Sequence, residues 1–246
     1  FLPGGVFNEC VRNGQRKRKI MIKVIKQSWI FRVILIALML IAIEIPPIAV
    51  NFALRYSKTN QLIVDGFMVL FICLMLAIIW WAHRTYETYN QLGQPAGIKV
   101  GWIIGGYLAI ILGMDVLSYL NQLIYHQTET ANNAALGSML GHNEVITIVF
   151  CFSAVVLSPI AEEFIFRGTL TNMFFKRGNI WPKVIFSGVI FSTGHMSTNP
   201  ISFLIYAYMG MVLAYVYLRT DDIRNSIAIH MINNAIAMYV LLVQVI

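Results

Sequence analysis

The stretch LIVDGFMVLFICLMLAIIWW, Leu62–Trp81, is apolar along nearly its whole length and contains a single charged residue, Asp65. A run of about 18 or more apolar residues is long enough for a helix to cross the hydrocarbon core of a bilayer. The chain of 246 residues has 58% hydrophobic and only 12% charged residues, with a mean hydropathy of +0.70. This composition excludes an ordinary soluble domain and predicts a membrane protein.

Further apolar windows accompany this one, and together they predict about seven membrane spans. Every backbone N–H and C=O group in hydrocarbon must be hydrogen-bonded within the protein, and the sequence lacks the alternating pattern of a barrel. We therefore predict an all-α fold, a polytopic transmembrane helical bundle. No internal repeat is visible, which argues against transporter folds built from duplicated halves. The predicted spans are Ile30–Phe52, Leu62–Trp81, Val100–Leu120, Val145–Phe166, Trp181–Met196, Pro200–Leu218 and Ser226–Ile246.

Residues 1–20, with five basic residues and Glu9, contribute +4 of the formal net charge of +7, and most of the other basic residues stand in the segments between spans. These residues crowd alternate loops, whereas the loop between Leu120 and Val145 has no Lys or Arg. The positive-inside rule then predicts an N-terminus in the cytoplasm and a C-terminus outside. This distribution indicates topology and not a surface that binds nucleic acid or acidic lipid, so no nucleic acid is predicted as a partner. Membrane lipid is a predicted partner because the spans cross the bilayer. The three cysteines lie far apart in the sequence and form no recognisable disulfide framework or metal motif.

Composition also divides the chain into parts. Residues 1–20 are polar and basic, so we interpret them as a tag or a disordered segment and exclude them from fold reasoning. The segment that begins at Met21 is typical of the N-terminus of a membrane protein. The alternative interpretation is a cleaved signal peptide, but the apolar run that follows is long and lacks a cleavage site made of small residues. Residues 21–125 hold the first three predicted spans, and residues 143–246 hold the last four.

Ionisable side chains inside the spans are the most informative residues. Each costs roughly 2.5–3.5 kcal/mol at bilayer depth, so each needs a partner, a water-filled cavity or a function. Those within or beside the predicted spans are Glu44, Asp65, Asp115, Glu162, Glu163, Arg167, His195 and His230.

The fourth span ends in SPIAEEFIFRG, Ser158–Gly168, which contains two adjacent glutamates. Neighbouring helical residues point about 100° apart, so we expect that Glu162 and Glu163 cannot both face one site. Glu163 stands four residues before Arg167, the favourable register for a helical ion pair. Glu162 is then left without a local partner and is available as a general base. The alternative is that both acids anchor the helix end at the membrane interface.

Two histidines occupy the fifth and seventh spans. In FSTGHM, Phe191 and His195 are four residues apart, and in IAIHMINNAI, His230 and Asn234 have the same spacing. Asn234 could orient the imidazole of His230 or donate a hydrogen bond to a developing oxyanion. A lone histidine in the position of His195 is more often a hydrogen-bonded packing residue than a catalyst. The pair of His230 and Asn234, taken alone, is equally well explained by hydrogen bonds between helices.

Taken together, one carboxylate, two imidazoles and one amide supply the groups needed for hydrolysis of an amide bond. A serine or cysteine mechanism fits less well, because the sequence contains no Gly-x-Ser-x-Gly motif and Cys73 and Cys151 stand apart from any histidine. Two other functions remain open. A transporter would also carry buried acids and histidines, with Glu44 and Asp115 extending a proton path. A non-enzymatic immunity or scaffold protein would use the same helices to bind a membrane partner.

At these residues the sequence resembles the CAAX-processing and bacteriocin-processing family of intramembrane proteases, also called the CPBP or Abi family. Three short motifs in the right order, each in its own span, are specific together although each alone is weak. The family motif EExxxR is matched by Glu162, Glu163 and Arg167, the motif FxxxH by Phe191 and His195, and the motif HxxxN by His230 and Asn234.

The resemblance covers roughly Val145–Ile236, so it implies that residues 143–246 form the protease core and that residues 21–125 form variable helices. One departure concerns the loop after the sixth span. The family commonly has Thr-Gly-Ser there, whereas Thr220 is followed by Asp221 and Asp222. The resemblance implies an endopeptidase acting on a membrane-associated protein or peptide, in CAAX-type processing or in bacteriocin self-immunity. It also implies four catalytic residues, Glu162, His195, His230 and Asn234, supported by Glu163, Arg167 and Phe191.

A metal is the remaining alternative for the site. Glu162, His195 and His230 are zinc-ligand types, but the motif HExxH is missing and the ligands would come from separate helices. We favour a glutamate mechanism that requires no cofactor, in which Glu162 and His195 activate water and His230 and Asn234 stabilise the oxyanion, as the resemblance implies.

This assignment requires His195 to lie close to Glu162. His195 lies about 20 Å along its own helix from Pro182, too far from the cytoplasmic side for a straight, upright span. Either the fifth helix starts later, with residues 181–184 lying in the membrane interface, or Gly188 and Gly194 allow it to tilt. We predict a water-accessible pocket that opens to the cytoplasm and holds His195 within about 10 Å of Glu162.

Overall fold

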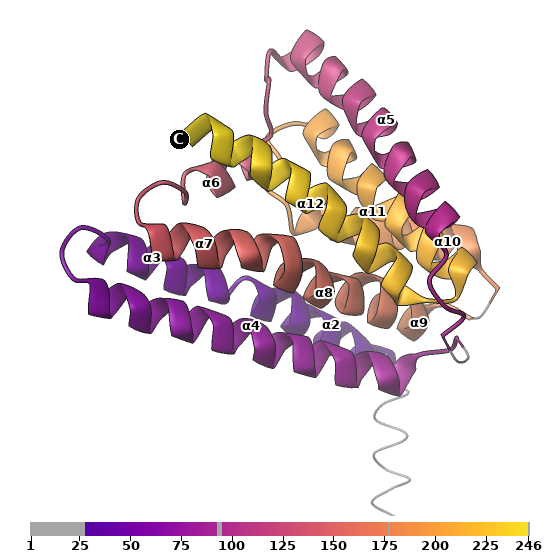
Figure 1. Cartoon of the computed structure of the whole chain (residues 1–246). Helices are drawn as coiled ribbons and strands as arrows, with labels where there is room; N and C mark the ends of the chain where they lie inside the picture. Colours follow the sequence, from indigo (N-terminus) through magenta and orange to yellow (C-terminus); the bar gives the residue numbers. More distant parts are fainter. Residues whose placement is uncertain (1–27, 93–94, 177, 246) are drawn as a thin grey trace, which may run out of the picture. The chain divides into compact units, whose positions relative to one another are not determined.

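The computed structural model describes residues 28–92, 95–176 and 178–245, and these residues form helices and loops without a β-strand (Figure 1). The predicted all-α fold is thus confirmed. The chain divides after Leu38 into two compact units, and the second unit, Met39–Ile246, contains all predicted site residues. The interpretation of residues 1–20 as a tag or a disordered segment falls outside the described residues, and the orientation of the N-terminus remains a prediction.

Six helices or helix pairs among the described residues are long and apolar enough to cross a membrane. The first predicted span is two helices, α2 (Trp29–Ile43) and α3 (Pro46–Tyr56). Pro46 and Pro47 begin α3, and because proline lacks an N–H donor, the helical hydrogen bonds are interrupted at Glu44 and Ile45. The next two spans are α4 (Gln61–Tyr89) and α5 (Val100–Tyr125), and a short helix, α6 (Ala131–Gly137), follows.

The fourth span is longer and less regular than predicted. It covers residues 144–174 as α7 (Glu144–Phe152), the π-helical segment η1 (Ser153–Leu157), α8 (Ser158–Glu162), the π-helical segment η2 (Glu163–Leu170) and α9 (Thr171–Phe174). π-Helical turns are rare and frequently occur at functional sites. Here one begins at Glu163, within the EExxxR motif.

The fifth predicted span, Trp181–Met196, is the helix α10 (Ile180–Thr193), which has only 14 residues. At about 1.5 Å per residue it is roughly 21 Å long, less than the ~30 Å of a hydrocarbon core. The helix begins at Ile180, so the first of the two alternatives, a later start, is wrong. The second, a tilt allowed by Gly188 and Gly194, stays a prediction. The helix ends before His195, which therefore lies in a loop rather than on a helical face.

The last two spans, α11 (Pro200–Thr220) and α12 (Ile223–Val245), complete the bundle. α11 packs against α5, α10 and α12 (Figure 1). Its approach to α10 requires glycine: a Cβ atom on Gly188 would lie 2.5 Å from the carbonyl oxygen of Ala207. Small residues at such crossings let membrane helices pack backbone to backbone.

The loop between α11 and α12 differs in sequence from the family pattern yet forms a tight turn. Asp221 ends α11 in the left-handed region, with φ of 53°. Glycine adopts this conformation most easily, but aspartate is among the few other residues that tolerate it. Asp222 accepts a hydrogen bond from the backbone N–H of Gly97, which links this loop to the segment before α5.

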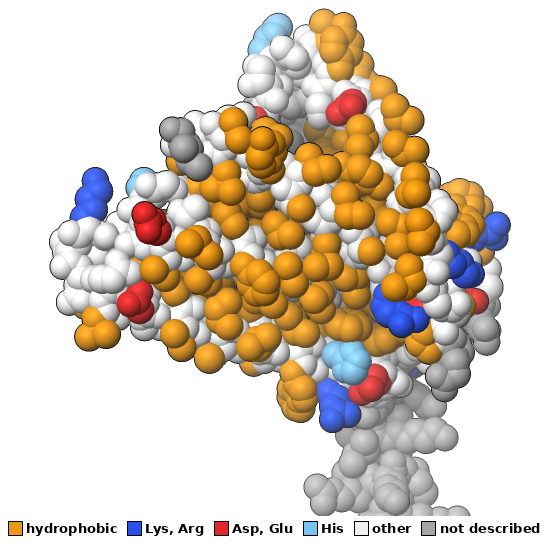
Figure 2. Space-filling view, in the orientation of Figure 1, with side chains coloured by type: hydrophobic (Ala, Val, Ile, Leu, Met, Phe, Trp, Pro, Cys, Tyr) orange, Lys and Arg blue, Asp and Glu red, His pale blue; other side chains and the backbone are white. Residues whose placement is uncertain are grey.

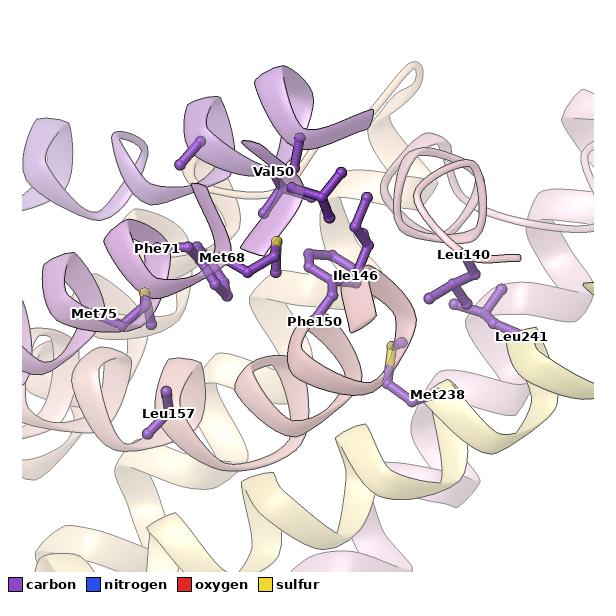
Figure 3. Packing of buried hydrophobic residues seen from close by; sticks show 13 residues of the cluster. Val50, Met68, Phe71, Met75, Leu140, Ile146, Phe150, Leu157, Met238 and Leu241 are labelled. Carbon is purple, nitrogen blue, oxygen red and sulfur yellow. The ribbon is translucent and has the colours of Figure 1, made fainter. Parts of the chain in front are cut away.

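An apolar cluster joins α3, α4, α7 and α12 (Figure 3). Its labelled members include Val50, Met68, Phe150 and Met238. On the face shown in Figure 2, apolar side chains cover the middle of the surface over α4, α7 and α12. Exposed apolar side chains of this kind are expected where a helix faces lipid, so the structure supports a multi-pass membrane protein.

Candidate active site

The two adjacent glutamates differ in burial. The side chain of Glu163 is completely buried, whereas that of Glu162 is 16% exposed. Glu163 forms the predicted ion pair with Arg167, whose Nη1 lies 3.3 Å from Glu163 Oε1. Removing one partner of such a buried pair would leave an uncompensated charge in a medium of low dielectric constant. Glu163 and Arg167 are therefore held together within the bundle.

Arg167 also connects the glutamate helix to α10 and α11. Its guanidinium carbon lies 4.3 Å from the ring centre of Phe191, in cation–π geometry. Its Nη2 donates a hydrogen bond to the carbonyl oxygen of Gly210, at 3.4 Å. Phe191, predicted as a supporting residue, is thus the ring on which the arginine rests.

The imidazole of His230 lies between the two glutamates. Its Nδ1 is 3.0 Å from Glu163 Oε1, and its Nε2 is 3.7 Å from Glu162 Oε2. The prediction that the two acids cannot both face one site is therefore wrong. The 100° between neighbouring residues separates their Cβ directions, but the two nitrogens of one imidazole point to different sides and reach both carboxylates.

The ring of Phe191 contacts both His195 and His230. The ring of Phe191 is 4.4 Å from the ring of His195 and 5.7 Å from that of His230. His195 also stacks on Tyr206 at 4.4 Å. Its Nδ1 contacts the carbonyl oxygen of Phe191 at 3.0 Å, and because a carbonyl only accepts, Nδ1 must carry the hydrogen. The structure therefore brings His195 to the same region of the bundle as His230.

Asn234 does not orient His230, because Glu163 takes that role. The Nδ2 of Asn234 instead donates a hydrogen bond to the carbonyl oxygen of Ala154, at 2.9 Å. Ala154 belongs to the π-helical segment η1. A π-helical turn changes the local pattern of backbone hydrogen bonds. In this one, the carbonyl oxygen of Ala154 accepts a hydrogen bond from the side chain of Asn234 on α12.

A pocket of about 370 Å³ lies beside His195. Its walls come from the end of α2, from Glu44 at the break before α3, from Phe166 and from the loop after α10. The lining residues are Leu40, Ile41, Ile43, Glu44, Phe166, Thr193, Gly194, His195 and Met196. The direction in which it opens, predicted to be the cytoplasm, depends on the orientation of the chain and stays a prediction.

The donor set does not fit a metal centre. Within the described ranges, no group of three or more His, Cys, Asp or Glu side chains gathers in a way that could hold a metal ion. The three alternative ligands, Glu162, His195 and His230, do not form such a group among the described residues.

Sequence reasoning missed several contacts of the site. The bond between Glu163 and His230 joins residues 67 positions apart, so no spacing could reveal it. Tyr206 lies in an apolar helix and carries no motif that distinguishes it from a packing residue. Glu44 was visible as an acid inside a span, next to two prolines, but its place beside His195 was not.

Comparison with known proteins points to the same part of the chain. Residues 144–236 match the family model described as Rce1-like, type II CAAX prenyl endopeptidase. The candidate membrane peptidase YdiL of Bacillus subtilis is 24% identical over 217 residues, covering 85% of this chain and 86% of that protein. The membrane-embedded CAAX protease MroQ of Staphylococcus aureus is 24% identical over 151 residues, covering 58% of this chain and 59% of its own length. No solved structure matches.

Proposed function

Because residues 144–236 place this chain among the CAAX-type membrane proteases of the CPBP family, we propose that it cleaves peptide bonds by activating water with Glu162. The observation that carries the proposal is the contrast between the two glutamates. Glu163 Oε1 contacts both Arg167 and His230, whereas Glu162 Oε2 is buried without a hydrogen-bond partner among the described residues. Glu162 is thus the carboxylate left available to accept a proton.

His195 is the proposed partner of Glu162 in holding the water. Since Nδ1 donates to the Phe191 carbonyl, the neutral imidazole presents the lone pair of Nε2. An Nε2 lone pair can accept one hydrogen of a water molecule while a carboxylate accepts the other. The imidazole of His195 stacks on Tyr206 and contacts the tilted ring of Phe191, and these contacts restrict its orientation, which supports such a positioning role.

His230 and Asn234 are the proposed donors to the oxyanion. Glu163 accepts the hydrogen of His230 Nδ1, so Nε2 can donate to the oxyanion only in the imidazolium form, in which both nitrogens carry a hydrogen. We therefore assign the imidazolium form of His230 to this step. Asn234 uses Nδ2 to reach the Ala154 carbonyl, and an amide has a second hydrogen for another acceptor. Donors held in place before the reaction stabilise developing charge without reorganisation.

The proposed reaction is a hydrolysis. Glu162 takes one proton from water as the oxygen attacks the carbonyl carbon of the peptide bond. The resulting oxyanion is stabilised by His230 and Asn234. When the C–N bond breaks, the protonated Glu162 returns the proton to the nitrogen of the leaving group, so that a carboxylic acid and an amine are formed. The acid then gives its remaining proton to the amine or to water, and no metal is required. We further propose a membrane-associated peptide or protein as substrate, in a bacterial plasma membrane, in CAAX-type processing or bacteriocin self-immunity.

The test uses the full chain reconstituted in vesicles with a library of internally quenched peptides that have apolar cores. We expect cleavage that persists in the presence of 1,10-phenanthroline and falls by about 100-fold or more in Glu162→Gln, the loss typical of a removed general base. Glu144→Gln, at an exposed acid at the start of α7, is the matched control and should cleave like the wild type.

Three results would contradict the proposal. Cleavage that survives in a folded Glu162→Gln protein would exclude this residue as the base. Cleavage abolished by the chelator and restored by zinc would show a metal mechanism. Proton or ion flux through the wild-type protein without cleavage of any peptide would favour the transporter alternative.

A further inference from the structure

Glu44 is an acid that the proposed reaction does not use. It follows α2 and precedes the proline pair that begins α3, where the helical hydrogen bonds are interrupted. Its backbone N–H bonds to the carbonyl oxygen of Ile41, at 3.2 Å, which closes a turn. The break therefore places a carboxylate in the middle of the span that covers residues 29–56.

The side chain of Glu44 shares the pocket of about 370 Å³ with His195. This volume lies within the range of roughly 300–1,000 Å³ that small-molecule sites occupy. Apart from Glu44 and His195, the lining is almost entirely apolar, with Ile41, Phe166 and Met196 among the walls. The pocket thus combines apolar walls with one carboxylate, next to a residue of the proposed active site.

The carboxylate of Glu44 has no counter-charge among the residues that line this pocket. Glu163 is neutralised by Arg167 in the buried ion pair, so the guanidinium is already engaged. Glu44 forms no hydrogen bond or ion pair through its side chain with any residue the structure describes. An unpaired acid at bilayer depth costs several kcal/mol, and that cost is offset when a cation binds.

We propose that Glu44 binds a lysine or arginine side chain of the substrate peptide and so selects peptides with a basic residue close to the cleaved bond. A long basic side chain fits such a pocket, because its aliphatic stem can pack on Ile41, Phe166 and Met196 while its charged end reaches the carboxylate. This inference rests on the proposed protease function. It adds a substrate class that the motif residues do not define.

The test compares peptides that differ at one position. Internally quenched peptides with the same apolar core carry lysine, norleucine or glutamate at successive positions on both sides of the cleaved bond. We expect the wild-type chain in vesicles to cleave the lysine peptide at least 10-fold more efficiently, in kcat/KM, than the norleucine peptide at one position. Glu44→Gln should remove this preference and leave the norleucine peptide within about 3-fold of the wild-type rate.

A charge reversal and a control sharpen the result. Glu44→Lys should favour the glutamate peptide, while Asp65→Asn, at an acid that pairs with Gln61 on α4, should keep the wild-type preference. Should Glu44→Lys fail to fold, the comparison of Glu44→Gln with the wild type decides alone.

The outcomes separate the two proposals. If the wild type cleaves lysine, norleucine and glutamate peptides alike, the role of Glu44 is overturned and the protease function stands. The same conclusion follows if Glu44→Gln keeps the lysine preference, or if it loses activity on all peptides equally while its melting temperature is unchanged. If no peptide is cleaved by the wild type, the proposed function itself has failed.

Discussion

Helices α5 and α11 are almost equally apolar, yet they occupy different environments. The most apolar window of α5 has a mean hydropathy of 1.9 and that of α11 a value of 1.8. Only 11% of the α5 window is buried within the protein, compared with 56% of the α11 window. In a membrane, apolar side chains face lipid as readily as they face protein. Hydropathy therefore predicts that a helix spans the bilayer but not whether it is central.

The difference lies in what the two helices contact. α11 carries none of the motif residues, yet its Gly210 accepts a hydrogen bond from Arg167 and its Tyr206 stacks on His195. α5 contributes no comparable contact to the site and exposes large side chains such as Leu112 and Val116. The central helix thus supports the site through small residues, backbone carbonyls and an aromatic ring. Substitutions in the central and peripheral regions should differ accordingly.

The largest difference is expected between a buried and an exposed ion pair. Arg167 and Glu163 are completely buried, whereas Arg84 and Glu87 on α4 form a pair whose side chains are 65% and 48% exposed. Arg167→Met should lower the free energy of unfolding by about 3–5 kcal/mol, because Glu163 would keep a buried charge without its cation. Arg84→Met should change it by less than about 1 kcal/mol. Denaturant unfolding in detergent micelles measures both.

A double variant checks the physical cause. Glu163→Gln combined with Arg167→Met removes both charges, so it should be more stable than Arg167→Met alone. A double variant as unstable as Arg167→Met would show that lost packing on Phe191, and not the unpaired charge, explains the effect.

The fold class and the Glu163–Arg167 ion pair could be predicted because both depend on local sequence. Span length is visible in apolar runs, and the Glu163–Arg167 pair follows from helical spacing. The α2–α3 break was missed although Pro46 and Pro47 are visible in the sequence, because a continuous apolar run dominated the interpretation. The predicted fifth span ran past the end of α10 at Thr193, because the four-residue spacing of Phe191 and His195 was interpreted as a helical repeat.

The geometry of the site could not be predicted in the same way. The position of His230 between two carboxylates depends on how α12 packs against α8 and η2, and no residue spacing encodes that packing. The hydrogen bond of Asn234 to Ala154 depends on a π-helical turn, whose sequence SAVVL is unexceptional. Motif residues show which groups the chemistry needs, whereas their partners are set by helix packing.

Replacing a glycine by alanine should destabilise the protein at a central helix crossing and should not do so on the peripheral helix α5. A Cβ atom on Gly188 would lie 2.5 Å from the Ala207 carbonyl and 2.9 Å from the Met211 nitrogen, so α10 and α11 would have to move apart. We expect Gly188→Ala to lower the melting temperature, at a cost of about 1–3 kcal/mol for overpacking. Gly105 on α5 has open space around the same position. Gly105→Ala should be neutral or stabilise by up to about 1 kcal/mol, through better helix propensity.

The activity of these variants tells whether the crossing also positions the site. Gly188→Ala should reduce peptide cleavage as well, since Phe191 and His195 follow on the same helix and its loop. Equal melting temperatures for Gly188→Ala and Gly105→Ala would show that the α10–α11 crossing is looser than the structure indicates.

The smallest effect is expected where the peripheral region joins the central one. Asp222, in the loop between α11 and α12, accepts hydrogen bonds from the Arg224 guanidinium and from the backbone N–H of Gly97, the latter just before α5. The hydrogen bonds from Arg224, and then the one from Gly97, outweigh burial and lower the pKa of the Asp222 carboxyl below its ordinary value. A carboxylate with a lowered pKa stabilises the folded state above the pKa of the unfolded chain, near 4, and this contribution is lost as the pH falls through the folded-state pKa.

Asp222→Asn should therefore be less stable than the wild type by about 1 kcal/mol at pH 7, where the hydrogen bonds to a charged acceptor are present. The difference should shrink as the pH falls below about 4, because the wild-type carboxyl then becomes neutral as well. Melting temperatures of both proteins from pH 7 to pH 3 measure this, and the other carboxylates cancel in the difference. If the difference in melting temperature between the two proteins does not change with pH, the charge of Asp222 is not the cause. The hydrogen-bond geometry of its side chain would then account for its link between the segment before α5 and the central helices.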